Sequence, residues 1–264
     1  MSAVIFLLLG TVLIIAPLIS NQIGKDKAHS EIDHFEELKD SIEQTEPSGA
    51  LNNEDKPSEE VNPAVQQPKE KGNKDGETHK AVYHIDAERL YRDSVAYNEN
   101  LKKQQYDLLI SENSYRQASL NLYDYGVPNN IYGYISASSI GMELPIYLGA
   151  TDDNMAFGAA HLTYTSLPIG GESTNCVLAA HTGYIGRVFF DDIRYLEIGD
   201  IVKITNYWDT LSYKVIDKQI YKKYESSNCY ITDGKDLLTL ITCAHGGVDR
   251  YYVMCESVDN LSTD

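Results

Sequence analysis

Basic residues are scarce in this sequence. It holds 22 Lys and Arg against 39 Asp and Glu, which gives a formal net charge of −17. A nucleic-acid partner needs clustered Lys and Arg to neutralise phosphates, so this balance argues against nucleic-acid binding. The 264 residues leave room for one or two domains, and an apolar content of 42% is ample for a core.

Cysteines are few, and several familiar binding motifs are missing. The four cysteines are Cys176, Cys229, Cys243 and Cys255. They show neither the C-x-x-C spacing of a metal site nor the density of a disulfide scaffold. An even number permits disulfides in an exported protein, but nothing in the sequence pairs them. No stretch fits a Rossmann loop, a P-loop or an EF-hand, which excludes the nucleotide and calcium sites that these motifs build.

The chain starts with a long apolar run. Ala3–Ile19 is nearly unbroken Val, Ile, Leu and Phe, and with the next four residues it approaches the roughly 20 residues that cross a bilayer. We predict a transmembrane anchor over residues 1–24, with a cleaved signal peptide as the alternative. Lys25 and Lys27 follow the run, so the positive-inside rule alone would leave the rest of the chain in the cytoplasm.

Two segments of different character follow. Residues 25–80 are rich in Glu, Asp, Lys, Pro, Asn and Gln and have almost no aromatics, so we predict a disordered acidic linker. Over residues 81–130 apolar side chains return at helical spacing, which predicts one or two amphipathic helices. The apolar stripe comprises Leu90, Val95, Tyr97, Leu101, Leu108 and Leu109.

From Ile131 onwards short apolar runs alternate with Gly, Pro, Asn and Asp, which is typical of an antiparallel barrel or sandwich. We predict this mainly β domain over residues 131–258, with a tail over 259–264. The candidate strands are Tyr132–Ala137, Leu144–Tyr147, Val177–Ala180, Ile201–Thr205, Thr210–Gln219, Leu237–Cys243 and Arg250–Cys255. Short helices are expected at Asp153–Ala160 and Val188–Leu196, the second with Phe189, Phe190, Ile193 and Leu196 facing inward.

One predicted strand ends on a cysteine. Leu237–Cys243 alternates β-branched and apolar residues, and the turn Ala244–Asp249 leads to a strand that opens with Arg250. A thiol at a strand end beside a guanidinium on the partner strand holds a nucleophile next to a fixed positive charge. A buried core cysteine and a solvated arginine are the structural alternative.

A histidine follows another predicted strand in the same way. Val177–Ala180 delivers His181 at its end, before a turn that contains glycine. A free cysteine is mostly thiol at neutral pH, so an imidazole that stabilises the thiolate and later protonates a leaving amine completes a catalytic pair. A turn histidine bonded to its own backbone is the alternative.

Two further histidines need a role. His245 lies two residues after Cys243 and competes with His181 as the base, whereas His161 is expected to be structural. A zinc site from Cys243, His245, Cys255 and His181 is conceivable, but the ligand spacing does not support it.

These motifs resemble those of sortases. Leu237–Cys243 is similar to their Thr-Leu-x-Thr-Cys motif, Arg250-Tyr-Tyr-Val to their arginine strand, and Ala179-Ala-His181-Thr-Gly to the position of their histidine. The resemblance is strongest to class C, or pilus-assembling, sortases. It extends from about Ile131 to Glu256 in the order His, Cys, Arg, and the class C segments are Gly133-Tyr-Ile-Ser, Leu144-Pro-Ile-Tyr and Gly158–Ser173.

The resemblance implies a closed eight-stranded β-barrel of the sortase type, anchored by one helix in the cell membrane of a Gram-positive bacterium with its catalytic domain outside. Cys243 would attack the Thr–Gly carbonyl of a Leu-Pro-x-Thr-Gly-like sorting signal, His181 would transfer protons, and Arg250 would bind substrate or steady the oxyanion. The implied partners are secreted surface proteins or pilins and an amine acceptor, either a pilin lysine or a cell-wall peptide. No metal or cofactor is implied.

Three features depart from the class C pattern. Leu122–Pro128 has no Asp-Pro pair for the plug of a lid, the turn between Cys243 and Arg250 is short, and no hydrophobic helix follows Glu256. These departures leave two alternatives: a sortase that anchors single proteins without building pili, and a catalytically silent surface-binding module.

Overall fold

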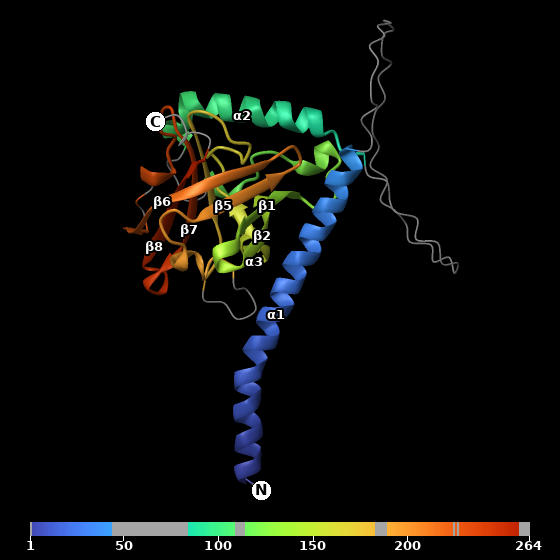
Figure 1. Ribbon diagram of the computed structural model, residues 1–264, viewed down its shortest axis with the longest axis vertical. Coiled ribbons are helices and arrows are strands. Elements are labelled where there is room, and N and C mark those ends of the chain that lie inside the picture. The colour runs from blue at the N-terminus through green and yellow to red at the C-terminus, as the bar shows by residue number, and fades with distance from the viewer. Residues whose placement is uncertain are drawn as a thin grey trace, which may run out of the picture.

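Eight strands close into a barrel in the second half of the chain (Figure 1). The computed structural model describes residues 2–43, 84–108, 114–182, 189–223, 225 and 227–258. The strands are β1 (Ile131–Ala137), β2 (Met142–Leu148), β3 (Ala159–His161), β4 (Thr174–Ala179), β5 (Ile201–Asn206), β6 (Thr210–Lys222), β7 (Asp236–Ala244) and β8 (Asp249–Ser257). Their order around the barrel is β1-β2-β3-β4-β7-β8-β6-β5.

Strand β7 is covered on both faces. It pairs in parallel with β4 and antiparallel with β8, and all its residues from Asp236 to Thr242 are buried. Leu238 and Leu240 belong to the core inside the barrel, whereas Ile241 belongs to a separate apolar cluster outside it. A strand covered on both sides needs a continuous apolar sequence, which is why this run has so few polar residues.

The closed, mainly β barrel confirms the expected fold class, and a strand is present at each of the seven predicted places. Strand β3 was missed because three residues are too few to show alternation. The helix predicted over Asp153–Ala160 ends earlier, as α3 (Asp152–Phe157). The helix predicted over Val188–Leu196 is wrong: the described part holds only the single turn η4 (Ile193–Tyr195), although its predicted inward stripe is buried.

The N-terminal helix α1 (Ser2–Glu43) extends well past the predicted anchor. Residues 25–43 were predicted as disordered linker, and this prediction is wrong because they form helix and pack on the barrel. The buried face comprises Ala28, Ile32, Phe35 and Leu38. Residues three and four apart share one face of a helix, so a few apolar side chains suffice in an acidic sequence. Residues 44–80 of the predicted linker, and the tail, lie outside the described residues.

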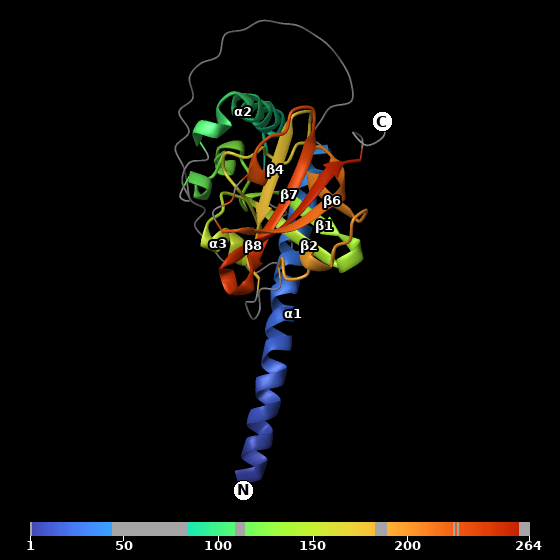
Figure 2. The same ribbon diagram turned by 90° about the vertical axis from the view of Figure 1, so that its left-hand side faces the viewer.

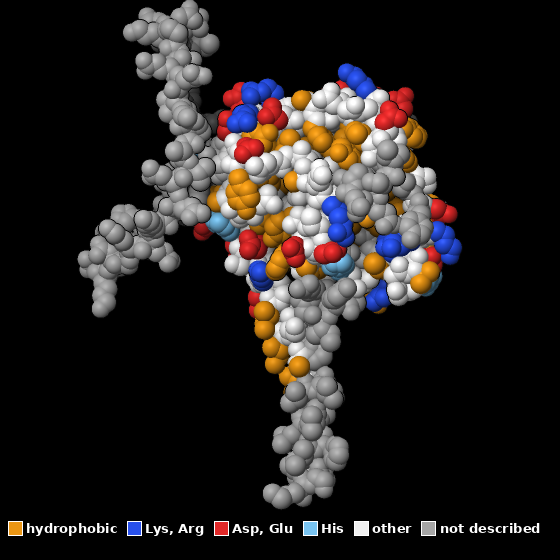
Figure 3. Space-filling view, turned by 180° about the vertical axis from the view of Figure 1, so that it is seen from behind, with side chains coloured by type: hydrophobic (Ala, Val, Ile, Leu, Met, Phe, Trp, Pro, Cys, Tyr) orange, Lys and Arg blue, Asp and Glu red, His pale blue; other side chains and the backbone are white. Residues whose placement is uncertain are grey.

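The free half of α1 extends beyond the barrel (Figure 1). Its exposed apolar side chains include Ile15, Ile19 and Ile23, and apolar side chains are visible along this part of the helix in Figure 3. Among the described residues, no helix combines the length and the apolar character that a membrane crossing requires. The anchor predicted over residues 1–24 is therefore not supported by the structure.

Helix α2 (Ala87–Leu108) lies across the end of the barrel that is upper in Figure 1. Leu90 and Leu101 are buried as predicted, but besides Ala87 the other buried positions of the helix are polar, namely Ser94, Asn98 and Gln105. Val95, Tyr97 and Leu108 of the predicted stripe are partly buried, and Leu109 lies outside the described residues. Polar residues can occupy the buried face because each finds a hydrogen-bond partner there, as the buried hydroxyls of Tyr132 and Ser94 do at 2.7 Å.

A second core lies between the helices and the outer face of β1. The Phe35 ring of α1 lies 4.7 Å from the ring of Tyr207, and Trp208 contacts Tyr91 of α2 at 5.2 Å. Two short turns, η1 (Ser114–Arg116) and η2 (Leu122–Tyr125), connect α2 to the barrel. This layer of rings joins both helices to the barrel.

Candidate active site

Cys243 lies on the outer face of the barrel, close to the C-terminal end of β7, where the strand is no longer fully buried. Side chains alternate along a strand, so Cys243 points to the same side as Ile241, which packs outside the barrel. Cys243 is the first half-buried residue after the buried run of β7. The thiol is thus held by a rigid strand and remains accessible.

Arg250 is the direct partner of Cys243 in the ladder between β7 and β8. Side chains that oppose one another in an antiparallel pair lie on the same face, with Cβ atoms about 5 Å apart. The Nη1 atom of Arg250 donates to the carbonyl oxygens of Gly247 and Asp249, both at 3.0 Å. The guanidinium is therefore fixed over the turn that joins the two strands, on the same face of the sheet as Cys243.

His181 follows β4, the other neighbour of β7. The parallel ladder places Ala179 opposite Ile241. It continues one residue further, because the amide of Ala180 donates to the Ile241 carbonyl at 3.3 Å and the Thr242 hydroxyl donates to the Ala180 carbonyl at 2.9 Å. The next step brings His181 level with Cys243, one strand spacing of about 4.8 Å away.

The three predicted site residues thus form one row across the outer face of β4, β7 and β8, which Figure 2 shows side by side. The row holds an imidazole, a thiol and a guanidinium in that order. A thiol flanked in this way has both a base to generate the thiolate and a cation to stabilise negative charge. The catalytic roles of His181, Cys243 and Arg250 stay predictions.

Two hydrogen bonds connect the end of β4 to Phe190 and Asp191. The amide of Phe190 donates to the His181 carbonyl at 3.3 Å, and the Thr182 hydroxyl donates to Oδ1 of Asp191 at 2.9 Å. These contacts fix the backbone at the end of β4, where His181 lies.

An apolar cluster on the outer face adjoins the row. Val177, Ile241, Tyr252 and Cys229 are its buried members. Cys229 belongs to η5 (Ser227–Cys229), in the connection between β6 and β7. This connection therefore covers the outer face next to Cys243.

Buried amide side chains hold that connection in place. Gln105 of α2 accepts from the amide of Ile231 at 2.8 Å and donates to the carbonyls of Tyr164 and Cys229 at 3.0 and 3.3 Å. Asn175 of β4 donates to the carbonyls on either side of Cys229, at 2.9 and 3.0 Å. Neither amide was predicted from the sequence, and a polar position inside the α2 stripe was the signal that could have revealed Gln105.

The turn after Cys243 contains a second oriented imidazole. The short turn η6 (His245–Gly247) lies at the end of the barrel opposite α2. Nδ1 of His245 lies 2.8 Å from Oδ2 of Asp249, and Nζ of Lys222 lies 3.1 Å from the other oxygen of that carboxylate. The hydrogen bond from His245 and then the Lys222 ammonium hold the pKa of Asp249 below its usual range. His245 was a candidate from the sequence, whereas its carboxylate partner Asp249 was not predicted.

His161 is fully buried and plays the structural part that was predicted. Its Nε2 lies 3.0 Å from the Ser166 carbonyl, and its Nδ1 lies 3.2 Å from the Ser119 hydroxyl. Burial lowers the pKa of His161 to about 4, so the ring is neutral at pH 7 and fastens two loops together.

The remaining thiols are buried. Cys176 and Cys255 lie in the core inside the barrel and Cys229 in the outer cluster. None of the four cysteines, all in the described part, forms a disulfide. Burial raises the pKa of Cys229 to about 12 and also raises those of Cys176 and Cys255. Because Cys255 faces inward and Cys243 outward, the zinc alternative cannot assemble.

The region considered for a lid plug lies under α2. The Tyr125 hydroxyl donates to Asp93 at 2.9 Å, and the guanidinium of Arg89 lies 4.8 Å from the Tyr125 ring. Tyr125 is buried in the core shared with the helices. Tyr125 therefore packs under α2 and not over Cys243.

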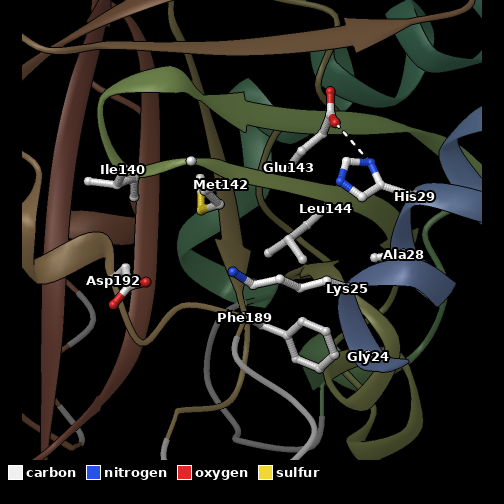
Figure 4. Close-up of a pocket in the computed structure, with 11 residues that line it drawn as sticks. Gly24, Lys25, Ala28, His29, Ile140, Met142, Glu143, Leu144, Phe189 and Asp192 are labelled. Carbon is white, nitrogen blue, oxygen red and sulfur yellow. Dashed lines mark ion pairs between the residues drawn. The ribbon is translucent and has the colours of Figure 1, made fainter. Parts of the chain in front are cut away.

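A small pocket between α1 and the barrel is separate from the row (Figure 4). Lys25 and His29 of α1 face β2 and Phe189 across it, and Nδ1 of His29 lies 3.2 Å from Oε2 of Glu143 at its rim. Its volume of about 50 Å³ admits a few water molecules and no peptide. We assign it to helix docking.

The barrel and its row define a class, that of β-barrel proteins with a cysteine and a histidine at neighbouring strand ends. The family model for the sortase domain matches residues 135–258. The chain therefore carries a sortase domain, and sortases are cysteine transpeptidases.

Three relatives illustrate the similarity. Sortase A of Bacillus anthracis is 32% identical over 115 residues, which are 43% of this chain and 52% of that protein, so the chain spans about half the length of this curated relative. Among solved structures, the pilus-related sortase C of Group B Streptococcus is 29% identical with a TM-score of 0.57, covering 65% of this chain and 89% of that one. Sortase C2 of Group B Streptococcus pilus island 1 is 31% identical with a TM-score of 0.55, covering 65% and 96%.

Proposed function

We propose that this chain cleaves a Leu-Pro-x-Thr-Gly-like sorting signal between Thr and Gly and transfers the new carboxyl end to an amine. The observation that carries the proposal is the row of His181, Cys243 and Arg250 on three adjacent strands. The substrates are surface proteins or pilins, and the acceptor is a pilin lysine or a cell-wall peptide amine.

Each residue of the row has one task. The Cys243 thiolate attacks the Thr carbonyl carbon, His181 gives a proton to the leaving glycine amine, and a thioester forms on Cys243. Arg250 lies beside the thiol, so its charge stabilises the oxyanion that develops in the transition state. An incoming amine then attacks the thioester, His181 takes the proton that the amine loses, the C–S bond breaks with Cys243 leaving as thiolate, and the product is an amide.

Cell-surface location is part of the proposal and comes from the family. Single-pass anchoring through residues 1–24, with the catalytic domain outside, stays a prediction from the apolar run. Detergent extraction of the protein from cell membranes, compared with that of a chain lacking residues 1–24, tests it. Equal solubility of the two chains without detergent contradicts anchoring.

The central test is to trap the acyl-enzyme. A library of sorting-signal peptides is incubated with the protein, and mass spectrometry maps any thioester, which is expected on Cys243. An electrophilic thiol probe gives a second measurement, since the three buried cysteines with raised pKa values act as internal controls. Fast, pH-dependent labelling of Cys243 that slows in His181→Ala supports the proposal, and labelling at equal rates in both proteins contradicts it.

A second candidate is a sortase that anchors single proteins without polymerising pilins. The position of Tyr125 under α2, rather than over the thiol, favours it. Competition between a pilin lysine peptide and a cell-wall peptide amine for the same acyl-enzyme separates the two candidates. Preferential capture by the lysine peptide supports polymerisation, and preferential capture by the cell-wall amine supports anchoring.

A further inference from the structure

His181 lies just beyond the paired part of β4. The last pairs of that strand join Ala179 to Ala160 of β3 and to Ile241 of β7. A catalytic group must keep its geometry to within about 0.5 Å, and a displacement of about 1 Å can cost about 100-fold in rate. The position of His181 level with Cys243 therefore needs support beyond the two ladders.

Two hydrogen bonds supply such support, one at His181 and one at the residue after it. The amide of Phe190 donates to the carbonyl of His181 at 3.3 Å. The hydroxyl of Thr182 donates to Oδ1 of Asp191 at 2.9 Å. A hydrogen bond to a carboxylate is roughly twice as strong as one between neutral groups, so the bond from Thr182 is the stronger of the two.

The acceptor side of this contact is anchored in the core. Phe190 is fully buried inside the barrel, and Phe189 and Ile193 belong to the same cluster. Ala28 of α1 joins that cluster, and Figure 4 shows Phe189 at the pocket under this helix. Asp191 directly follows Phe190, so its carboxylate is attached to a part of the chain that close packing holds in place.

The support comes from the inside of the barrel, whereas the row lies on its outer face. Phe190 is part of the inner core, and Cys243 points outward with Ile241. The contact from Asp191 therefore acts on the backbone that carries the imidazole. Side-chain rotamers depend on the backbone angles φ and ψ, so a fixed backbone at His181 and Thr182 fixes the direction of the ring.

We propose that Asp191, acting through the hydroxyl of Thr182, is the positioning residue of His181. It holds the end of β4 so that the imidazole stays level with Cys243 while substrates bind and leave. The inference rests on the proposed function, in which His181 and Cys243 form the reactive pair. Asp191 acts through another residue and has no chemical step of its own.

The test measures alkylation of Cys243 by iodoacetamide in the full chain over a range of pH values. Mass spectrometry locates the label, and the three buried cysteines are internal controls. Thr182→Val keeps the side-chain volume and removes the donor. We expect its labelling rate at pH 7 to fall about tenfold, part of the roughly 100-fold that a displaced group can lose. Its pH profile should move toward that of His181→Ala, whereas Thr182→Ser keeps the hydroxyl and should restore the rate to within about twofold.

A double-mutant cycle shows whether the two side chains act together. Asp191→Ala should slow labelling as much as Thr182→Val does. The double variant should be no slower than either single variant, because both substitutions remove the same hydrogen bond. Asp191→Asn keeps an oxygen that accepts from Thr182, so its rate should stay within about threefold of that of the unaltered protein.

Thr174 provides a matched control at the other end of β4. Its hydroxyl lies 3.1 Å from Oδ1 of Asp236, so Thr174→Val removes the same kind of contact from the start of the strand. We expect Thr174→Val to lower the thermal midpoint and to leave the pH profile of Cys243 unchanged. The comparison separates support of His181 from a general loss of stability.

Three results overturn the inference: labelling in Thr182→Val within about twofold of the unaltered protein, an equal loss in Thr174→Val or Thr182→Ser, and losses that multiply in the double variant. Equal labelling of Cys243 in His181→Ala and in the unaltered protein contradicts the proposed function instead. The ¹H–¹³C spectrum of the His181 ring then still tests the inference. Resonances that shift in Thr182→Val but not in Thr174→Val support it, and unchanged resonances overturn it.

Discussion

Two sides of the same barrel are covered in different ways. On one side α1 and α2 pack large apolar side chains against β1, with Phe35 and Leu90 fully buried. On the other side, at the ends of β4, β7 and β8, the strands emerge half-buried and carry His181, Cys243 and Arg250. The helical side contributes packing, and the strand-end side contributes reactive groups that need solvent access.

The two sides are linked through hydrogen bonds to loops. Gln105 extends from α2 to the connection between β6 and β7, which covers the outer face beside Cys243. The helical layer therefore also positions the connection between β6 and β7 near the site. If the helical side serves packing and the strand-end side serves catalysis, substitutions on the helical side change stability and substitutions on the strand-end side change the reaction rate.

The largest expected effect is that of Cys243→Ala. Removing the nucleophile should lower turnover of a sorting-signal peptide at least about 1000-fold, because no thioester can form. The thermal midpoint should hardly change, because the residue is half-exposed. Cys229→Ala is the matched control in a buried position, and it should lower stability while leaving Cys243 reactive. If Cys243→Ala turned over the peptide at nearly the rate of the unaltered protein, the strand-end side would not be the catalytic side.

Phe35→Ala tests the helical side. Deleting this fully buried ring should cost about 3–5 kcal/mol of the packing between α1 and the barrel. Hydrogen exchange along α1 measures the loss, and the labelling rate of Cys243 should stay the same. Ile23→Ala, on the exposed part of the same helix, should cost less than about 0.5 kcal/mol. Similar costs for the two substitutions would show that α1 does not dock through this face.

The next effect is a pH dependence that comes from His161. Its pKa of about 4 in the folded protein lies below the unfolded value of about 6.5, so the unfolded state binds more protons between these values. The stability is fully present above pH 6.5 and falls by about 3 kcal/mol as the pH drops to 4. Denaturant unfolding at several pH values measures it. In His161→Gln this part of the slope should vanish, and an unchanged slope would assign it to other groups.

Gln105→Ala should have the smallest effect and connects the two sides. It leaves the amide of Ile231 and the carbonyls of Tyr164 and Cys229 without this partner, which costs about 1–3 kcal/mol. Because the connection between β6 and β7 beside Cys243 becomes less rigid, KM for the peptide should rise more than kcat falls. Gln104→Ala, on the exposed face of the same helix, is the control. Identical kinetics in the two variants would show that α2 does not influence the site through Gln105.

The sequence was most informative where a local pattern and the chemistry agree. Seven of the strands could be predicted because their apolar runs are bounded by turn residues, and the positions of His181, Cys243 and Arg250 at strand ends followed from those runs. The helical stripe in residues 25–43 was missed because averaged composition conceals a few apolar residues that share one face. Strand β3 was missed because three residues carry no period.

Contacts between distant segments were beyond the sequence. Asp249 as the partner of His245 depends on the tight return of β8, and Gln105 as a clamp depends on where α2 crosses two loops more than 50 residues away. No local pattern encodes such pairs, because each residue alone looks like an ordinary polar side chain. The polar residues on the buried face of α2 are explained by hydrogen-bond partners that lie far away in the sequence.

By itself the sequence predicted a mainly β domain, seven of its strands and the three residues of the row, since alternation and turn residues act over short distances. The tertiary structure decided that β4 lies beside β7 in parallel, which brings His181 level with Cys243 across 62 residues of chain. It also decided that the thiol faces outward and that the turn after it holds a second oriented imidazole. These facts depend on strand register and closure of the barrel, which are set by packing of the whole chain.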